Sequence, residues 1–308
     1  MMRDQAARHR EDLKDVLAEV RRIEVQSKRL VTDVMAGGYA SVFRGAGIAF
    51  DEVREYVDGD DPRSVDWNVT ARMGHPYVKK YVEERELTVL FLLDLSLSME
   101  GGFAARSSRA FAARVCACLA LAAVTSNDKV GLVAFGCEVE HYVPPAKGTR
   151  HALRIVRDAL ALPAAPGGTD LGAALDFTAR VRRRRAVLFL LSDFMAEGWE
   201  RAAKRCARRH DLIAVRFLAP ETTAPTAGLM RLEDPETREQ ALVDWRLTGL
   251  RSCYEEEVRA WRTRTEEVLK RAGVDLMDVP LPPLPDARAV ADPILRFFRM
   301  RELRGCKR

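Results

Sequence analysis

The sequence predicts an α/β fold, a doubly wound and mostly parallel sheet with helices on both faces. Two observations predict it. Apolar runs such as residues 87–93 and 186–191 are too continuous for half-exposed strands, so they indicate strands that are buried on both faces. Helical segments alternate with these strands, as they do in βαβ units. The chain has 308 residues, of which 47% are hydrophobic, enough for one large domain with attachments.

Two segments precede the predicted sheet. Apolar residues recur at helical spacing among many charges in residues 5–35, so we expect an N-terminal helical segment at 1–36. Residues 37–86 are polar and contain Gly, Pro, Asp and Asn, which break regular structure. This second segment is too rich in aromatic residues to be a linker, and we expect it to pack on the core domain.

The alternating elements begin at residue 87. In order, we expect a strand at 87–94, a helix at 107–126, a strand at 130–135, an edge strand at 138–143, helices at 150–162 and 170–183, a strand at 186–191, a helix at 199–209 and a strand at 212–218. A hairpin around residues 234–237 follows, then a helix at 255–272 and a strand at 274–279. The core domain therefore spans 87–280, and a C-terminal helix lies in residues 281–308.

Composition excludes several classes of protein. The 50 basic and 45 acidic residues give a net charge of +5, which argues against a dedicated nucleic-acid binder. The first residues are charged and lack an apolar signal core.

The longest apolar run is interrupted by Arg114 and is shorter than the roughly 20 residues of a membrane span. The six cysteines are scattered, with no C-x-x-C pair, so we expect a cytoplasmic protein without a membrane span.

Oxygen-bearing side chains follow the two most apolar strands and a Gly-Gly loop between them. The carboxyl ends of central parallel strands meet at one crevice, so we expect these side chains to converge. The set is Asp94, Ser96, Ser98, Thr169 and Asp193. Two carboxylates and three hydroxyls suit Mg²⁺, Mn²⁺ or Ca²⁺ and not Zn²⁺. Each residue also has an ordinary interpretation as a turn former, or as a helix N-cap for Thr169.

The three pieces resemble a known metal site. "DLSLSM", "GGTD" and "LLSDF" are similar to the metal-ion-dependent adhesion site of von Willebrand factor type A domains. The resemblance covers about residues 87–280 and implies that the five residues above hold a divalent ion, which an acidic residue of a partner protein completes. This chain has Leu97 where that family often has glycine.

A second resemblance covers most of the chain. "GAGIAFDEVREYVDGDDPRSVDWNVTAR" followed by "YVKKYVEERELTVLFLLDLSLSM" resembles the bacterial family called domain of unknown function fifty-eight. That resemblance implies an adaptor that works with a MoxR-type AAA+ ATPase in protein maturation or remodelling. The candidate partner-binding residues are Asp51, Arg54, Asp60, Arg63, Asp66 and Arg72. The alternative is that Arg54 and Arg63 pair with nearby carboxylates inside the segment.

Three functional hypotheses follow. The first is a non-enzymatic, metal-dependent protein-interaction module. The second is a metal-dependent phosphohydrolase, because an aspartate after an apolar strand also begins the site of some aspartyl-phosphate phosphatases. Those enzymes need a second acid two residues later, where this chain has Ser96, and the sequence has neither a G-x-S-x-G elbow nor a P-loop. The third is a structural scaffold with a degenerate site. We prefer the first.

Overall fold

The computed structural model describes residues 18, 21–22, 49–57, 60–82, 86–225, 228–284, 286 and 288–305. The chain divides into two compact units, one formed by residues 43–87 and the other by the rest of the chain. Within the N-terminal helix predicted at 5–35, the described residues Ala18, Arg21 and Arg22 are helical. The remainder of that prediction lies outside the described residues.

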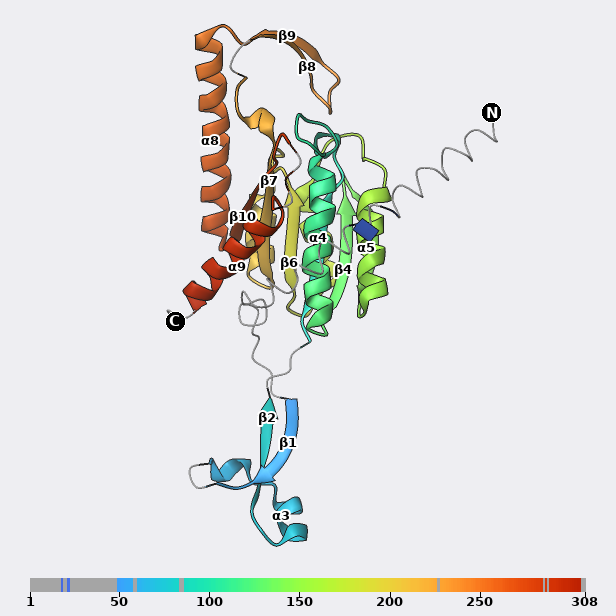
Figure 1. The fold of residues 1–308 in the computed structure, drawn as a ribbon, viewed down its shortest axis with the longest axis vertical. Helices are drawn as coiled ribbons and strands as arrows, with labels where there is room; N and C mark the ends of the chain where they lie inside the picture. Colours follow the sequence, from blue (N-terminus) through green and yellow to red (C-terminus); the bar gives the residue numbers. More distant parts are fainter. Residues whose placement is uncertain are drawn as a thin grey trace, which may run out of the picture. The chain divides into compact units, whose positions relative to one another are not determined.

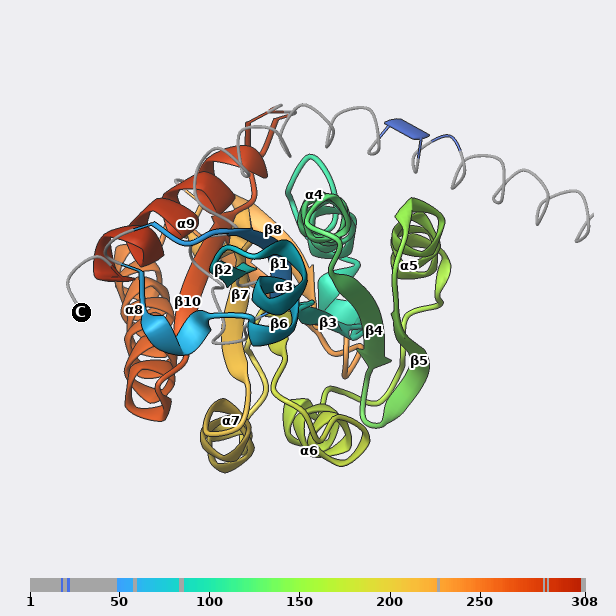
Figure 2. The same ribbon diagram turned by 90° about the horizontal axis from the view of Figure 1, so that it is seen from below.

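A six-stranded sheet organises the larger unit. Its order is β10–β7–β6–β3–β4–β5, and all pairings are parallel except that of the edge strand β5 with β4 (Figures 1 and 2). The strands are β3 (Thr88–Asp94), β4 (Lys129–Phe135), β5 (Val139–Ala146), β6 (Val187–Ser192), β7 (Asp211–Leu218) and β10 (Asp275–Pro280). The chain first adds β4 and then β5 on one side of β3. It then returns to the other side of β3 and adds β6, β7 and β10 in that order. The predicted doubly wound, mostly parallel sheet is confirmed.

The two most apolar runs of the sequence form the centre of this sheet. Every residue of β3 and β6 is buried, and Phe91 stacks on Phe189 of the neighbouring strand at 5.7 Å. The edge strand β5 has Val143 as its one buried residue and contains Pro144 and Pro145, which an edge tolerates because its outer side needs no N–H donor. Burial on both faces thus explains why the central strands are continuously apolar.

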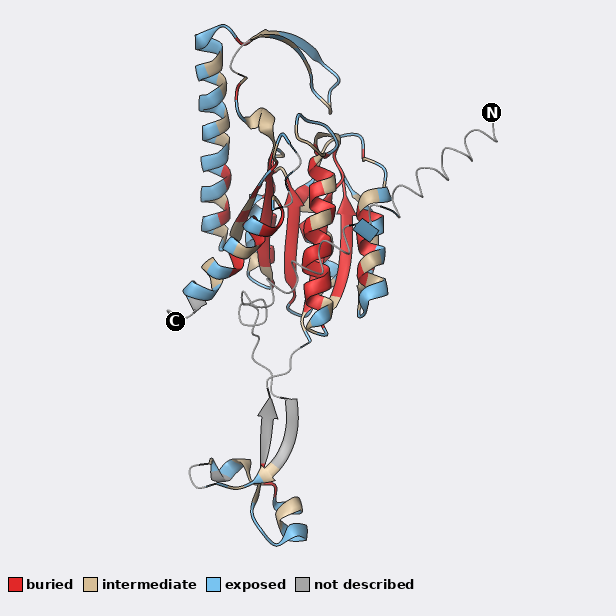
Figure 3. Ribbon diagram, viewed as in Figure 1, coloured by how far each residue is buried: buried red, intermediate tan, exposed pale blue. Residues whose placement is uncertain are grey.

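Helices cover both faces of the sheet (Figure 2). One face carries α4 (Ser108–Thr125), α5 (Thr149–Ala161) and α9 (Ala291–Gly305), and the other carries α6 (Leu171–Val181), α7 (Glu200–Ala207) and α8 (Thr248–Ala272). Among the described residues, α4 is the one helix long and apolar enough to cross a membrane. It is 78% buried inside the protein, as expected for the core helix of a domain, which can be equally long and apolar (Figure 3).

A hairpin lies beyond the carboxyl ends of the sheet, at the top of Figure 1. It consists of β8 (Leu229–Glu233) and β9 (Gln240–Asp244), paired antiparallel with Glu233 opposite Gln240. The hairpin predicted around residues 234–237 is therefore confirmed. Helix α8 follows and begins at Thr248, ahead of the predicted start at residue 255.

The smaller unit contains a second antiparallel pair, β1 (Ala49–Glu55) with β2 (Tyr77–Val82). A 3-10 turn (Pro62–Ser64) and the short helix α3 (Trp67–Met73) connect these strands. The unit corresponds closely to the predicted segment 37–86, and the packing of that segment on the core domain stays a prediction.

Candidate metal centre

The candidate site lies where the chain order of the sheet reverses, between the carboxyl ends of β3 and β6. Ligands of doubly wound sheets bind at this position because the connections from the two strands leave in opposite directions and open a crevice. Asp94 is the last residue of β3 and is fully buried, and Asp193 follows directly after β6.

Asp94 is held by hydroxyls and a backbone amide. Its Oδ1 accepts a hydrogen bond from the N–H of Ser96 at 2.9 Å and from the hydroxyl of Thr169 at 3.4 Å. Its Oδ2 accepts from the hydroxyl of Ser192 at 2.6 Å. Ser192 was not among the residues predicted from sequence, although its place directly before Asp193 in "LLSDF" was a signal that could have found it.

The two serines after Asp94 connect it to Asp193. The hydroxyls of Ser96 and Ser98 are 3.0 Å apart, and Ser98 donates to Oδ2 of Asp193 at 2.7 Å. The structure therefore brings all five predicted residues together in one chain of hydrogen bonds. Leu97 lies in a 3-10 turn, and it is not among the described non-glycine residues with positive φ, so the backbone there does not require glycine.

The third loop reaches the site because glycines permit a close approach. A Cβ on Gly136, after β4, would lie 2.4 Å from the Cβ of Ala165. Gly167 and Gly168, directly before Thr169, have φ values of +93° and +88°, a region that favours glycine. Asp170, not Thr169, caps α6 by accepting from the N–H of Ala173 at 2.8 Å. The interpretation of Thr169 as a simple helix cap is therefore excluded.

The residue after Asp193 is strained. Phe194 has φ of +60°, which is unusual for a bulky side chain, and it is 1% exposed. It packs edge-on against Trp199 with ring centroids 5.4 Å apart, and its N–H donates to Ser192 Oγ at 3.0 Å. Its carbonyl accepts from the indole of Trp261 at 3.1 Å. Surrounding contacts thus hold a strained conformation next to Asp193, a pattern that clusters at functional sites.

The electrostatics of the site favour a bound cation. Burial, followed by the charge of Asp193, raises the pKa of Asp94 to about 6. Burial also raises the pKa of Asp193, and the nearby charge of Glu236 adds to this effect. Within the described part of the chain, no lysine or arginine forms an ion pair with either aspartate. The charge of the Arg109 guanidinium interacts with Asp94 without forming an ion pair with it. Two adjoining buried carboxylates remain unfavourable unless a proton or a metal ion neutralises them.

The donor set decides which metals fit. The described residues contain no group of three or more His, Cys, Asp or Glu side chains arranged to hold a metal. The five predicted residues instead offer two carboxylates and three neutral hydroxyls, all hard oxygen donors. Such a set fits Mg²⁺, Mn²⁺ or Ca²⁺, which take oxygen ligands and often retain water.

A third carboxylate, which the sequence analysis did not assign to the site, reaches it from the hairpin. Oε1 of Glu236 accepts from the N–H of Ser98 at 3.2 Å, and Oε2 accepts from the N–H of Gly168 at 3.1 Å. The acidic turn around residues 234–237 was visible in the sequence, but nothing there indicated that the turn folds back onto the metal loops.

A cavity of about 420 Å³ lies beside the site, between the metal loops and the hairpin. Ser98 and Asp193 line its polar side, and Phe103 and Met195 contribute apolar surface. These two apolar side chains are 54% and 53% exposed. Exposed apolar residues next to a polar centre are typical of protein-binding surfaces.

The charged residues predicted as a partner surface lie in the smaller unit. Arg54 forms a bidentate pair with Asp60 at 2.6 and 2.9 Å, so the alternative of pairing inside the segment is confirmed for this arginine. Asp66 is the N-cap of α3 and accepts from two backbone amides. Arg63 and Arg72 are exposed. Asp51 lies in β1, but the structure describes only its backbone. A partner-binding role for these residues stays a prediction.

Comparison with known proteins adds the family context. A family model described as protein of unknown function DUF58 matches residues 52–264. An uncharacterized protein of Mycobacterium bovis is 30% identical over 270 residues, which cover 85% of this chain and 84% of that protein. The solved structure of the conserved hypothetical protein BatB from Bacteroides thetaiotaomicron is 17% identical with a TM-score of 0.43, covering 68% of this chain and 98% of that one. The VWA domain of SpRpn10 is 14% identical with a TM-score of 0.38, covering 68% and 94%.

Proposed function

The chain belongs to the DUF58 family, and from this premise we propose that it is a non-enzymatic protein-interaction module that binds its partner through a divalent metal ion. The observation that carries the proposal is the pair of adjoining carboxylates, Asp94 and Asp193, which are surrounded by hydroxyls and form no ion pair with a basic side chain among the described residues.

The residues of the site have distinct roles in this proposal. Asp94 and Asp193 would supply the negative charge, and Ser96, Ser98 and Thr169 would supply neutral oxygens. When bound, the ion neutralises the two carboxylates and offers a position to a further oxygen ligand. Few charged ligands leave the ion electrophilic, so an acidic side chain of a partner is a favourable addition to it. The exposed Phe103 and Met195 beside the site would bury apolar surface in the same complex.

We further propose a MoxR-type AAA+ ATPase as the partner and the cytoplasm as the location. The ATPase follows from the family resemblance of residues 47–99. The cytoplasm is supported by the free cysteines Cys116 and Cys206, both buried in the fold without a disulfide, as is typical of reducing compartments.

Capture of the ATPase tests this proposal. Immobilised wild-type protein is expected to retain a MoxR-type ATPase in Mg²⁺ buffer and to release it on chelation. Asp94→Ala is expected to retain at least tenfold less, since losing about 1.4 kcal/mol already lowers affinity tenfold. Retention by the variant equal to that of wild type would contradict the metal-dependent contact.

An activity assay tests the phosphohydrolase hypothesis separately. The same two proteins are assayed with p-nitrophenyl phosphate and Mg²⁺. We expect no hydrolysis above the buffer rate, because Ser96 occupies the position where a general acid would stand. Metal-dependent hydrolysis that disappears in Asp94→Ala would replace the interaction module by an enzyme.

A further inference from the structure

We propose that Glu236 is the chain's own ligand for the metal centre: it takes the place of the partner's acidic side chain, and a partner binds by displacing the hairpin β8–β9. This inference rests on the proposed function, because it concerns the regulation of the same metal centre. It predicts a self-closed state in the absence of a partner.

The contacts of Glu236 place its carboxylate between two of the three loops that carry the candidate ligands. One oxygen accepts from the N–H of Ser98 and the other from the N–H of Gly168, at 3.2 and 3.1 Å. Ser98 belongs to the loop after β3, and Gly168 directly precedes Thr169 in the third loop. A single side chain from a distant segment therefore bridges two of the three loops that carry candidate ligands.

The charge of this arrangement indicates a cation. Glu236 brings a further negative charge close to Asp193, since Ser98 donates its N–H to Glu236 and its hydroxyl to Asp193. Adjoining carboxylates repel one another when they are ionised. A divalent cation between them would turn that repulsion into attraction, so the approach of Glu236 is favourable when the metal is bound.

The turn that presents Glu236 is held by its own hydrogen bonds. Asp234 Oδ1 accepts from the N–H of Glu236 at 2.8 Å and from the N–H of Thr237 at 3.1 Å. The N–H of Arg238, which has φ of +63°, donates to the carbonyl of Asp234 at 2.9 Å. The tip of the hairpin can therefore keep its shape while it approaches or leaves the site.

The hairpin is suited to displacement because it buries little. No residue of β8 or β9 is buried, and the outward-facing Leu229 and Leu242 are 57% and 66% exposed (Figure 3). Its base is fixed, since Trp245 is 4% exposed and packs edge-on against Tyr254 with centroids 5.2 Å apart. Segments with few buried contacts open at low free energy. Opening would leave the metal loops and the cavity beside them to a partner.

Calorimetric titration with Mg²⁺ tests the role of Glu236. Glu236→Gln keeps the size of the side chain and removes its charge, so we expect Mg²⁺ affinity to fall by about tenfold or more, comparable to the 10- to 100-fold effect of removing groups that support metal sites. Glu239→Gln is the matched control, since Glu239 lies in the same turn and is exposed. The control is expected to bind Mg²⁺ as wild type does.

Acetate serves as the probe for the vacated position. In Glu236→Ala, added acetate at constant ionic strength is expected to restore part of the lost Mg²⁺ affinity, because a free carboxylate can occupy the place of the missing side chain. In wild type, acetate is expected to have no such effect, because Glu236 already fills that place.

The outcomes separate this inference from the proposed function. Mg²⁺ affinity that is unchanged in Glu236→Gln, together with an absence of acetate rescue in Glu236→Ala, would overturn the self-ligand and leave the metal centre intact. A wild type that binds no Mg²⁺ would overturn the metal centre, and the self-ligand with it.

Discussion

Replacement of Asp94 by asparagine is expected to stabilise the metal-free protein and to abolish its stabilisation by Mg²⁺. The pKa of Asp94 is raised to about 6 by burial and by the charge of Asp193. Above pH 6 the carboxyl is ionised in both states, but burial beside Asp193 makes that charge more costly in the native state than in the solvated unfolded chain, and asparagine removes this cost. The gain should be on the order of 1–3 kcal/mol in the metal-free protein.

The sign of this effect depends on pH. Below the usual aspartate pKa of about 4, the carboxyl is protonated in both the folded and the unfolded states, and the advantage of asparagine vanishes. As the pH rises from 4 through 6, wild type loses stability relative to Asp94→Asn. Thermal unfolding in chelator across this range measures the difference.

Addition of Mg²⁺ should make wild type more stable than Asp94→Asn, the reverse of their order without metal. Wild type is expected to gain about 2.7 kcal/mol when Mg²⁺ is present at 100 times its Kd, and Asp94→Asn is expected to gain nothing. Asp158→Asn is the matched control, because Asp158 is also buried but accepts a hydrogen bond from Arg157 at 2.9 Å. That variant should lose stability and keep its response to Mg²⁺. An equal response to Mg²⁺ in wild type and Asp94→Asn would contradict the assignment.

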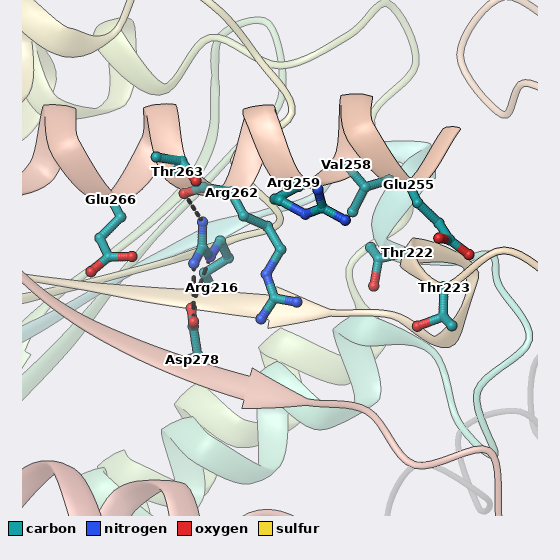
Figure 4. Close-up of a pocket in the computed structure, with 10 residues that line it drawn as sticks. All are labelled: Arg216, Thr222, Thr223, Glu255, Val258, Arg259, Arg262, Thr263, Glu266 and Asp278. Carbon is teal, nitrogen blue, oxygen red and sulfur yellow. Dashed lines mark hydrogen bonds and ion pairs between the residues drawn. The ribbon is translucent and has the colours of Figure 1, made fainter. Parts of the chain in front are cut away.

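The second large effect is expected at a buried arginine of β7. Arg216 of β7 is 1% exposed and forms a bidentate pair with Asp278 of β10 at 2.8 and 2.9 Å (Figure 4). It also donates to the carbonyl of Arg262 in α8 and lies over the ring of Trp261 at 5.3 Å. One guanidinium thus joins two strands and the long helix α8.

Asp278→Ala is expected to lower the free energy of unfolding by about 3 kcal/mol, because it leaves a buried charge without its partner. Chemical denaturation of the variant measures this loss. Glu267→Ala is the control, since Glu267 pairs with Arg271 on the exposed side of α8 and such pairs contribute at most about 1 kcal/mol. Similar losses in the two variants would show that the buried pair is no more important than a surface pair.

The sequence was sufficient to predict the sheet and most of the candidate site. Strands β3 and β6 are continuously apolar because they are buried on both faces, so their pattern indicates both strand type and central position. Once two central parallel strands are placed, the topology alone brings Asp94 and Asp193 to one crevice. Ser96 and Ser98 come directly after β3 and Thr169 follows the Gly-Gly loop, so their positions in the chain bring them to this pair.

Other features could not be predicted because they depend on tertiary placement. The turn that holds Glu236 was predicted from its local sequence, but a turn pattern carries no information about which surface the hairpin covers. Asp170 and Thr169 are both good N-cap residues, and only the loop path past Gly136 decides which one caps α6. Likewise, the acidic and basic residues of the polar segment allow several pairings, of which the structure shows Arg54 with Asp60.

Titration with Mn²⁺, followed by electron paramagnetic resonance, tests the central claim most directly, because the signal of free Mn²⁺ falls when the ion binds. Wild type is expected to bind Mn²⁺ in proportion to the chain concentration, to release it when Mg²⁺ is added, and to lose this binding in Asp94→Asn. Binding that is absent in wild type at millimolar Mn²⁺, or equal in wild type and Asp94→Asn, would contradict a metal centre at the ends of β3 and β6.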